Sequence, residues 1–219
     1  MGIAPINTSI MTMNLEQINH ELRGKSAPEI VRWALSLSLR PFVSTSFGPH
    51  SAAMLHLVSS IDASVPVVWV DSGYNLKDTY SVAEQLMSML PLNMHIYTPT
   101  VSAERWNAVN GGIPDLEAPE LHRSFTEQFK LAPFRRALDD LSPELWLTGI
   151  RREDTEYRQT LDVVSWDSGR NMLRVAPIFD WSDDEVEAYI LKHRLPTCQH
   201  YFDPTKVLTQ RECGLHTRL

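Results

Sequence analysis

The sequence has few cysteines and no long apolar run, and each shortage excludes a class of protein. Its two cysteines, Cys198 and Cys213, are too few for a four-cysteine zinc or iron–sulfur site within one chain. A disulfide-based scaffold is not expected in a chain of 219 residues. The apolar runs fall short of the roughly 20 residues that span a bilayer, and the first residues lack the pattern of a signal peptide. We therefore predict a cytoplasmic protein that is not embedded in a membrane.

Basic residues are outnumbered by acidic ones, 20 to 27, and the net charge of −7 is spread along the chain. No basic stretch marks a nucleic-acid surface, so no nucleic-acid partner is predicted. An anionic ligand would have to be held by a local group of cations against the overall field. A hydrophobic content of 43% is enough for one well-packed domain.

Short β-branched and aromatic segments alternate with longer helical patterns. Strands are predicted over residues 42–47, 65–71, 93–99, 144–150 and 172–178, and helices over residues 26–38, 49–60, 77–90, 134–141 and 182–193. Nearly continuous apolar strands separated by helices predict an α/β fold, a Rossmann-like parallel sheet with helices on both faces. The chain divides into an N-terminal helical segment (1–40), a nucleotide-binding domain (41–194) and a mobile C-terminal tail (195–219).

Ligands of such sheets bind beyond the carboxyl ends of the strands, so the residues there are the candidate site. The first strand runs into a small polar turn made of Ser44, Thr45, Ser46, Phe47 and Gly48. Pro49 then suits the start of a helix, whose amides and the nearby hydroxyls would cradle a phosphate or sulfate. An ordinary strand–helix turn with small polar caps is the alternative.

Two further strand ends and one helix add polar candidates. Asp71 and Gly73 could hold a ribose or a base edge, or simply cap the next helix. Guanidinium groups that suit phosphate or sulfate, or that form a solvated surface among acidic neighbours, belong to Arg151, Arg152 and Arg158. Lys130 is one more candidate cation. Together these residues predict a site for a nucleotide with several anionic groups.

The stretch "RECGLHTRL" places Cys213 beside a glycine and outside any apolar periodicity. Arg211 favours the thiolate, and His216 could orient the thiol or exchange a proton with it. We predict a reactive thiol on a mobile tail, which could react with a bound substrate and then turn to a second protein. Cys198, in "LPTCQHYFDP", is typical of a structural cysteine.

In order along the chain, the motifs "STSFG", "DSGY", "KLAPFRRAL", "GIRRE", "PIFDWSDDEV" and "RECGLH" resemble the signatures of the 3′-phosphoadenylyl sulfate (PAPS) reductases. The resemblance covers most of residues 40–219 and implies an adenine nucleotide alpha-hydrolase fold. It implies reduction of PAPS to sulfite and adenosine 3′,5′-bisphosphate, with thioredoxin or glutaredoxin as electron donor and no bound redox cofactor. Cys213 matches the nucleophile, and the 44–48 loop, Asp71, Gly73, Lys130, Arg151, Arg152 and Arg158 match positions that line the nucleotide site.

The resemblance leaves neighbouring functions open. Sister enzymes that use adenylyl sulfate (APS) typically hold an iron–sulfur cluster through cysteine pairs that this chain lacks, which favours PAPS, but a cluster-free APS reductase would look similar. An ATP pyrophosphatase and a sulfonucleotide-binding protein without turnover are further alternatives, and a homodimer is possible. The segment from Leu195 to Arg211 is shorter than the family pattern, and Lys206 could supply a cation that a longer loop would carry.

Overall fold

The computed structural model describes residues 13–115 and 117–206, so Arg211, Cys213 and His216 lie outside the described residues. Within them a six-stranded sheet has the order β3-β2-β1-β4-β6-β5. Neighbouring strands are parallel except for the antiparallel pair of β5 and β6. The strands are β1 Pro41–Thr45, β2 Pro66–Val70, β3 Asn93–Tyr97, β4 Leu145–Leu147, β5 Val164–Asp167 and β6 Met172–Val175.

The central strand β1 fixes the position of the site. Val43 of β1 pairs with Val67 of β2 on one side and with Leu147 of β4 on the other. From β1 the chain first builds the sheet outward through β2 and β3, and later returns to the opposite side of β1 with β4. The order of strands therefore reverses between β1 and β4, and such a reversal opens a crevice at the carboxyl edge of the sheet.

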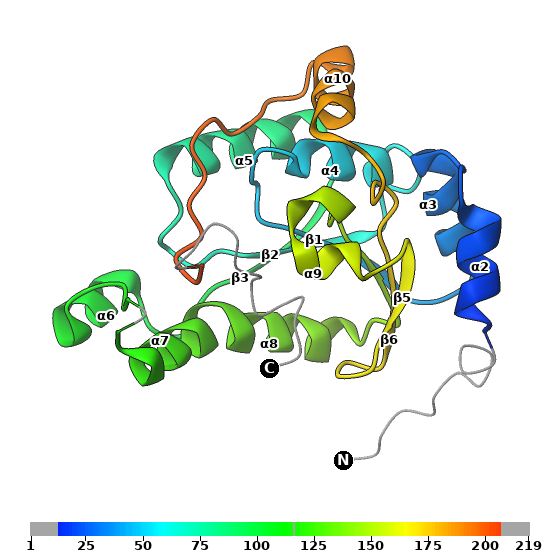
Figure 1. Ribbon diagram of the computed structural model, residues 1–219. Helices are drawn as coiled ribbons and strands as arrows, with labels where there is room; N and C mark the ends of the chain where they lie inside the picture. The colour runs from blue at the N-terminus through cyan, green and yellow to red at the C-terminus, as the bar shows by residue number, and fades with distance from the viewer. Residues whose placement is uncertain (1–12, 116, 207–219) are drawn as a thin grey trace.

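Helices cover both faces of the sheet (Figure 1). Helices α4, α5 and α10 lie over one face, α8 lies over the other, and α2 and α3 lie toward the β5 edge. The helices are α2 Leu15–Leu22, α3 Ala27–Ser36, α4 Ser51–Ser59, α5 Lys77–Met89, α6 Ala103–Asn110, α7 Pro119–Thr126, α8 Ala132–Leu141, α9 Glu156–Gln159 and α10 Asp183–His193. A π-helical turn, Glu127–Leu131, joins α7 to α8, and a 3₁₀ turn, Arg152–Asp154, precedes α9.

Apolar cores on both faces of the sheet hold these layers together. The larger core lies between the sheet and α3, α4, α5 and α10. The smaller core lies under α8, where the rings of Phe42, Phe134 and Trp146 contact one another with centroids 5.4–6.1 Å apart. The predicted parallel sheet with helices on both faces is confirmed. Within the described ranges, no helix is long and apolar enough to cross a membrane.

The sequence prediction missed β5 and the helices α6, α7 and α9, and it gave no bounds for α2, which lies in the predicted N-terminal helical segment. It also placed the start of α4 two residues early. Pro49 and His50 form a turn before that helix because the Ser51 amide donates to the Gly48 carbonyl at 3.0 Å. At the sheet edge, Asn19 of α2 completes the hydrogen bonding of β5. Its amide accepts from Val164 N and donates to Val164 O, both at 2.8 Å.

Candidate functional site

A cavity of about 380 Å³ lies at the carboxyl ends of β1 and β4, in the crevice expected from the strand order. Its polar lining consists of hydroxyl groups from the β1 turn, basic side chains and two carboxylates. These belong to Ser44, Thr45, Ser46, His50, Lys130, Arg151, Asp154, Arg158, Asp203 and Lys206. A smaller cavity of about 60 Å³ shares the β1 turn and Lys130. Its walls are more apolar and include Val68, Val70, Phe129, Phe134 and Phe202.

Contacts on two sides hold the turn after β1 in place. Phe47 has a left-handed backbone with φ of 50° and is fully buried, and its ring packs edge-on against Trp69 at 4.9 Å. The Ser44 hydroxyl accepts a 2.8 Å hydrogen bond from the indole of Trp146. On the other side, the Tyr201 ring closely covers Gly48, where a Cβ atom would be 3.4 Å from two ring carbons. These contacts hold the small polar residues at the cavity wall.

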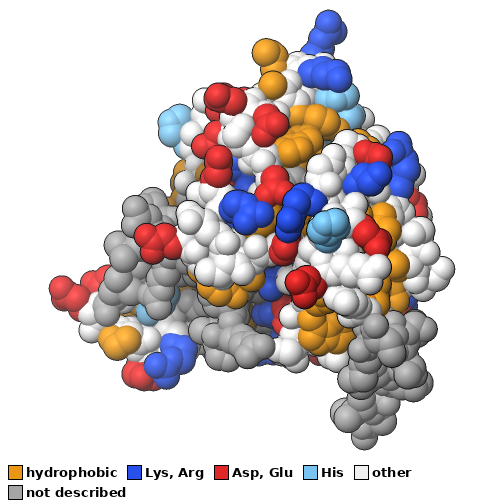
Figure 2. All heavy atoms as spheres, turned by 45° about the vertical axis from the view of Figure 1, so that its right-hand side comes forward, with side chains coloured by type: hydrophobic (Ala, Val, Ile, Leu, Met, Phe, Trp, Pro, Cys, Tyr) orange, Lys and Arg blue, Asp and Glu red, His pale blue; other side chains and the backbone are white. Residues whose placement is uncertain are grey.

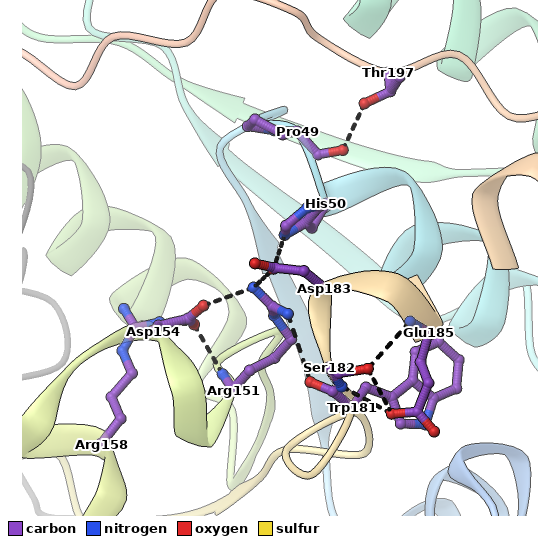
Figure 3. Close-up of polar contacts among 10 residues, drawn as sticks. All are labelled: Pro49, His50, Arg151, Asp154, Arg158, Trp181, Ser182, Asp183, Glu185 and Thr197. Carbon is purple, nitrogen blue, oxygen red and sulfur yellow. Dashed lines mark hydrogen bonds and ion pairs between the residues drawn. The ribbon is translucent and has the colours of Figure 1, made fainter. Parts of the chain in front are cut away.

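Arg151 follows β4 and lies between two carboxylates (Figure 3). Its Nη2 is 2.9 Å from Asp154 Oδ1 and 2.7 Å from Asp183 Oδ1. Asp154 also forms an ion pair with Arg158, so one carboxylate joins the two arginines. Asp183 is placed here because Ser182 caps α10, accepting from Glu185 N at 3.3 Å. Arg151 and Arg158 therefore form a cationic wall of the cavity, and the carboxylates of Asp154 and Asp183 neutralise part of its charge.

Residues 195–206, which we call the strap, cross the molecule beside the cavity. Thr197 donates from Oγ1 to the Pro49 carbonyl at 2.7 Å. The backbone amides of Gln199 and His200 donate to Asp78 Oδ2 at 2.7 and 3.0 Å. The strap is therefore fixed both to the β1 turn and to the first turn of α5.

The far end of the strap is fixed inside the cavity by an ion pair between Lys130 and Asp203. Their side chains are only 14% and 8% exposed, and Lys130 Nζ also donates to Thr205 Oγ1 at 3.0 Å. Burial acts to raise the pKa of Asp203, but the Lys130 ammonium and the hydrogen bonds from Lys130 and Thr205 outweigh it and lower that pKa overall.

Of the residues predicted from the sequence, the cavity brings together Ser44, Thr45, Ser46, Gly48, Lys130, Arg151 and Arg158. Phe47 instead belongs to the core beneath the turn. Arg152 points elsewhere, since its Nε and Nη2 bind Asp180 Oδ1 at 3.0 and 2.8 Å and its guanidinium covers the Phe179 ring. The positions of Phe47 and Arg152 are explained by contacts with residues distant in sequence, Trp69 and Asp180 respectively.

Asp71 and Gly73 shape the turn after β2 and do not line either cavity, although their neighbours Ser72 and Asn75 line the smaller one. Asp71 Oδ1 accepts hydrogen bonds from Gly73 N at 3.0 Å, Asn75 Nδ2 at 2.8 Å and Tyr80 OH at 2.7 Å. Burial and the Asp71 carboxylate raise the pKa of Tyr80 to about 12, so the phenol remains a donor at neutral pH.

The sequence prediction did not identify His50, Tyr201 or Asp203 as residues of the cavity. His50 had a signal, because it directly follows the "FGP" turn of a strand–helix junction. Asp203 and Tyr201 had none, since the strap reaches the cavity only through the fold. The Sγ of Cys198 donates to His200 O at 2.9 Å and is buried. Burial raises the pKa of this thiol, an environment in keeping with the structural role predicted for it.

The described part of the chain contains no group of three His, Cys, Asp or Glu residues arranged to hold a metal ion. Figure 2 shows Lys and Arg side chains interspersed with Asp and Glu on the face it presents. The cavity thus combines hydroxyls, paired cations and an adjoining apolar slot, an arrangement that suits an anionic nucleotide.

Comparison with known proteins agrees with this geometry. The model of the phosphoadenosine phosphosulfate reductase domain matches residues 40–205. The phosphoadenosine 5′-phosphosulfate reductase of a Synechococcus strain is 35% identical over 84% of this chain and 78% of its own length. The same-named protein of a Synechocystis strain is 37% identical over 86% of this chain and 75% of its own length.

A similar fold occurs in the crystal structure of phosphoadenylyl-sulfate reductase from Candida auris in complex with phosphate. It superposes with a TM-score of 0.73 at 22% identity, covering 91% of this chain and 92% of that one. The resemblance predicted from the sequence motifs is confirmed by the family model and the relatives. The chain belongs to the phosphoadenosine phosphosulfate reductase family.

Proposed function

We propose that this chain reduces PAPS to sulfite and adenosine 3′,5′-bisphosphate in assimilatory sulfate reduction. The observation that carries the proposal is the cationic cavity at the β1–β4 switch point in a chain of this family. PAPS carries two anionic ends, a 3′-phosphate and a 5′-phosphosulfate. The cavity is lined by four cations: Arg151 and Arg158, which share the Asp154 carboxylate, and Lys130 and Lys206.

The two joined cavities support a division of the nucleotide. The smaller cavity, with Val68, Val70 and Phe134 in its walls, is an apolar extension of the larger one against which one edge of the adenine would lie. The larger one, with the hydroxyls of Ser44 to Ser46, suits the phosphate and sulfate groups. Asp71 and Gly73 act indirectly in this arrangement, because they set the turn that holds Ser72 and Asn75 at the wall of the smaller cavity.

The proposed chemistry begins at Cys213, on the part of the chain that follows the strap. Its thiolate attacks the sulfur of the sulfate–phosphate anhydride and forms a sulfur–sulfur bond. The bond between that sulfur and the bridging oxygen breaks, and its electron pair leaves with adenosine 3′,5′-bisphosphate. The enzyme then carries a thiosulfonate. Arg211 favours the thiolate, and His216 exchanges its proton.

A dithiol protein, thioredoxin or glutaredoxin, completes the turnover. Its thiolate attacks Cys213 Sγ, the sulfur–sulfur bond to the SO₃ group breaks, and sulfite leaves with the bonding electrons. The second thiol of the donor then resolves the mixed disulfide and restores Cys213. The donor loses two electrons and the sulfate sulfur gains them, so no bound redox cofactor enters the scheme. We place this reaction in the cytoplasm.

The test is a mass measurement on the reduced protein mixed with PAPS, and separately with APS, without any donor protein. A gain of one SO₃ group on the Cys213 peptide with PAPS supports the nucleophile and the substrate together. Cys213→Ser should lose the adduct, whereas Cys198→Ser is the matched control and should keep it. An adduct only with APS would overturn the substrate. No adduct with either, on folded and reduced protein, would overturn the reductase function, and pyrophosphate release from ATP would then be measured.

A further inference from the structure

His50 is a titratable side chain of the cavity that the proposed reaction does not use. It is the second residue of the Pro49–His50 turn before α4, and it lines the larger cavity with Arg151 and Arg158. The side chain is 32% exposed, so a ligand that fills the cavity would cover much of what remains open. Its position next to the hydroxyls of the β1 turn places it where an anionic group would bind.

The nearest carboxylate is already engaged by a stronger partner. His50 Nδ1 is 3.8 Å from Asp183 Oδ1, beyond hydrogen-bonding distance, whereas Arg151 Nη2 is 2.7 Å from the same oxygen (Figure 3). Burial, and then the positive charge of Arg151, lower the pKa of His50, while Asp183, Asp154 and Glu187 act in the opposite sense. Without a bound anion, these effects favour the neutral imidazole over the imidazolium.

An anion in the cavity changes this balance. The cavity is lined by the cations Lys130, Arg151, Arg158 and Lys206 and by the carboxylates Asp154 and Asp203. The carboxylates of Asp183 and Glu187, on α10, also act on His50. The carboxylates already neutralise part of the cationic charge. A phosphate or sulfate entering beside the ring adds negative charge and displaces water, and a nearby opposite charge favours the protonated imidazole.

We propose that His50 is a substrate-binding residue that takes up one proton from solvent when the anionic nucleotide enters the cavity. The occupied site then carries one more positive charge than the empty site. This inference rests on the nucleotide site proposed above and assigns to it an additional residue and a change of charge. Because the proton is bound more tightly in the complex, affinity is enhanced at low pH and the gain is lost as pH rises through the pKa of the bound state.

The experiment is calorimetric titration of the full chain with adenosine 3′,5′-bisphosphate, in buffers of different ionisation enthalpy, which counts the protons taken up. Phosphate groups of the ligand also titrate near neutral pH, so the informative quantity is the difference between the wild type and His50→Gln. We expect the variant to take up fewer protons by on the order of half a proton or more near pH 6.5. Its affinity should be about tenfold weaker at pH 6, the worth of one charge-assisted hydrogen bond.

His56→Gln is the matched control. His56 lies within α4, the helix that His50 precedes, and is also partly buried, but its Nδ1 pairs with Tyr189 OH at 2.8 Å outside the cavity. That variant should bind the nucleotide with the same proton uptake as the wild type. An NMR titration of the His50 ring in the wild type, with and without nucleotide, provides a second readout that depends on no substitution.

The outcomes separate the two proposals. Equal affinity and proton uptake in the wild type and His50→Gln, or an unchanged His50 titration on binding, would overturn the role of His50 and leave the nucleotide site intact. Failure of the wild type to bind adenosine 3′,5′-bisphosphate at all would instead contradict the proposed function and this inference with it.

Discussion

Removal of the buried carboxylate at the end of the strap should destabilise the whole domain. In Asp203→Asn the Lys130 ammonium keeps its hydrogen bond to Thr205 but loses the negative charge beside it. Breaking a buried ion pair by removing one partner typically costs 3–5 kcal/mol, because the remaining charge is left buried. Lys130 is 14% exposed and keeps its hydrogen bond to Thr205, so we take the lower end, about 3 kcal/mol.

For a domain of this size each kcal/mol shifts the melting temperature by about 2–4 °C, which predicts a decrease of about 6–12 °C. The assay is thermal unfolding of the full chain followed by circular dichroism. Glu127→Gln is the matched control, because Glu127 lies in the same π-helical turn as Lys130 and also forms an ion pair. Its ion pair with Arg135 is about half exposed, and such pairs contribute roughly 1 kcal/mol or less.

The charge interaction can be separated from other effects by a double-mutant cycle with Lys130→Met. If the pair is coupled, the double variant should lose less stability than the sum of the two single variants, by about 1–3 kcal/mol. Since the pKa of Asp203 is lowered in the folded state, its contribution is present above the unfolded value near 3.8 and is lost as pH falls through the folded value. A melting temperature for Asp203→Asn equal to that of Glu127→Gln at pH 7 would refute this reasoning.

Two other substitutions test the backbone account. Gly73→Ala should lower the free energy of unfolding by about 1–2 kcal/mol, because φ is 75° at this position. Gly149→Ala should change it by less than about 0.5 kcal/mol, since the added Cβ meets Met54 at an ordinary 3.7 Å. Equal melting temperatures for the two variants would contradict the strain argument. Asn19→Ala should cost about 2 kcal/mol in denaturant unfolding, because it leaves both polar groups of Val164 without this partner. Asn93→Ala, which removes one exposed hydrogen bond, is its control and should cost under about 1 kcal/mol; a loss for Asn19→Ala no larger than this would exclude the proposed edge role.

Much of the sheet was predictable because its central strands are continuous apolar runs between helical segments. Residues 66–70 were identified on that basis. The edge strand 93–97 has the mixed sequence NMHIY and was identified from its β-branched and aromatic residues, and residues 172–175 were confirmed as a strand. The segment 164–167 was missed because its sequence, VSWD, mixes polar and apolar residues, and its pairing depends on an antiparallel neighbour and on Asn19. Strand order was likewise beyond the sequence, since it is determined by contacts between distant segments.

For the cavity, residues at strand ends could be found but the direction of each side chain could not. Arg151 and Arg152 are adjacent in sequence, yet the first lies in the cavity wall and the second binds Asp180 outside it. Two side chains after the same strand point in different directions, because Arg151 pairs with Asp154 and Asp183 whereas Arg152 pairs with Asp180. The strap residues Tyr201 and Asp203 were missed for the same reason, because they meet Gly48 and Lys130 only after folding.

The anchored strap also limits the position of Cys213, the proposed nucleophile. Lys206 lines the cavity, and Cys213 follows it by only seven residues. A fully extended chain of that length spans at most about 25 Å. Whatever path the intervening residues take, the thiol stays within that radius of the Lys206 backbone, which corresponds to an effective concentration in the millimolar range. In the proposed reaction, Cys213 and the nucleotide site are therefore connected by one short segment of chain. Release of the strap from Asp78 and Lys130 would lengthen that segment and lower the effective concentration of the thiol at the site.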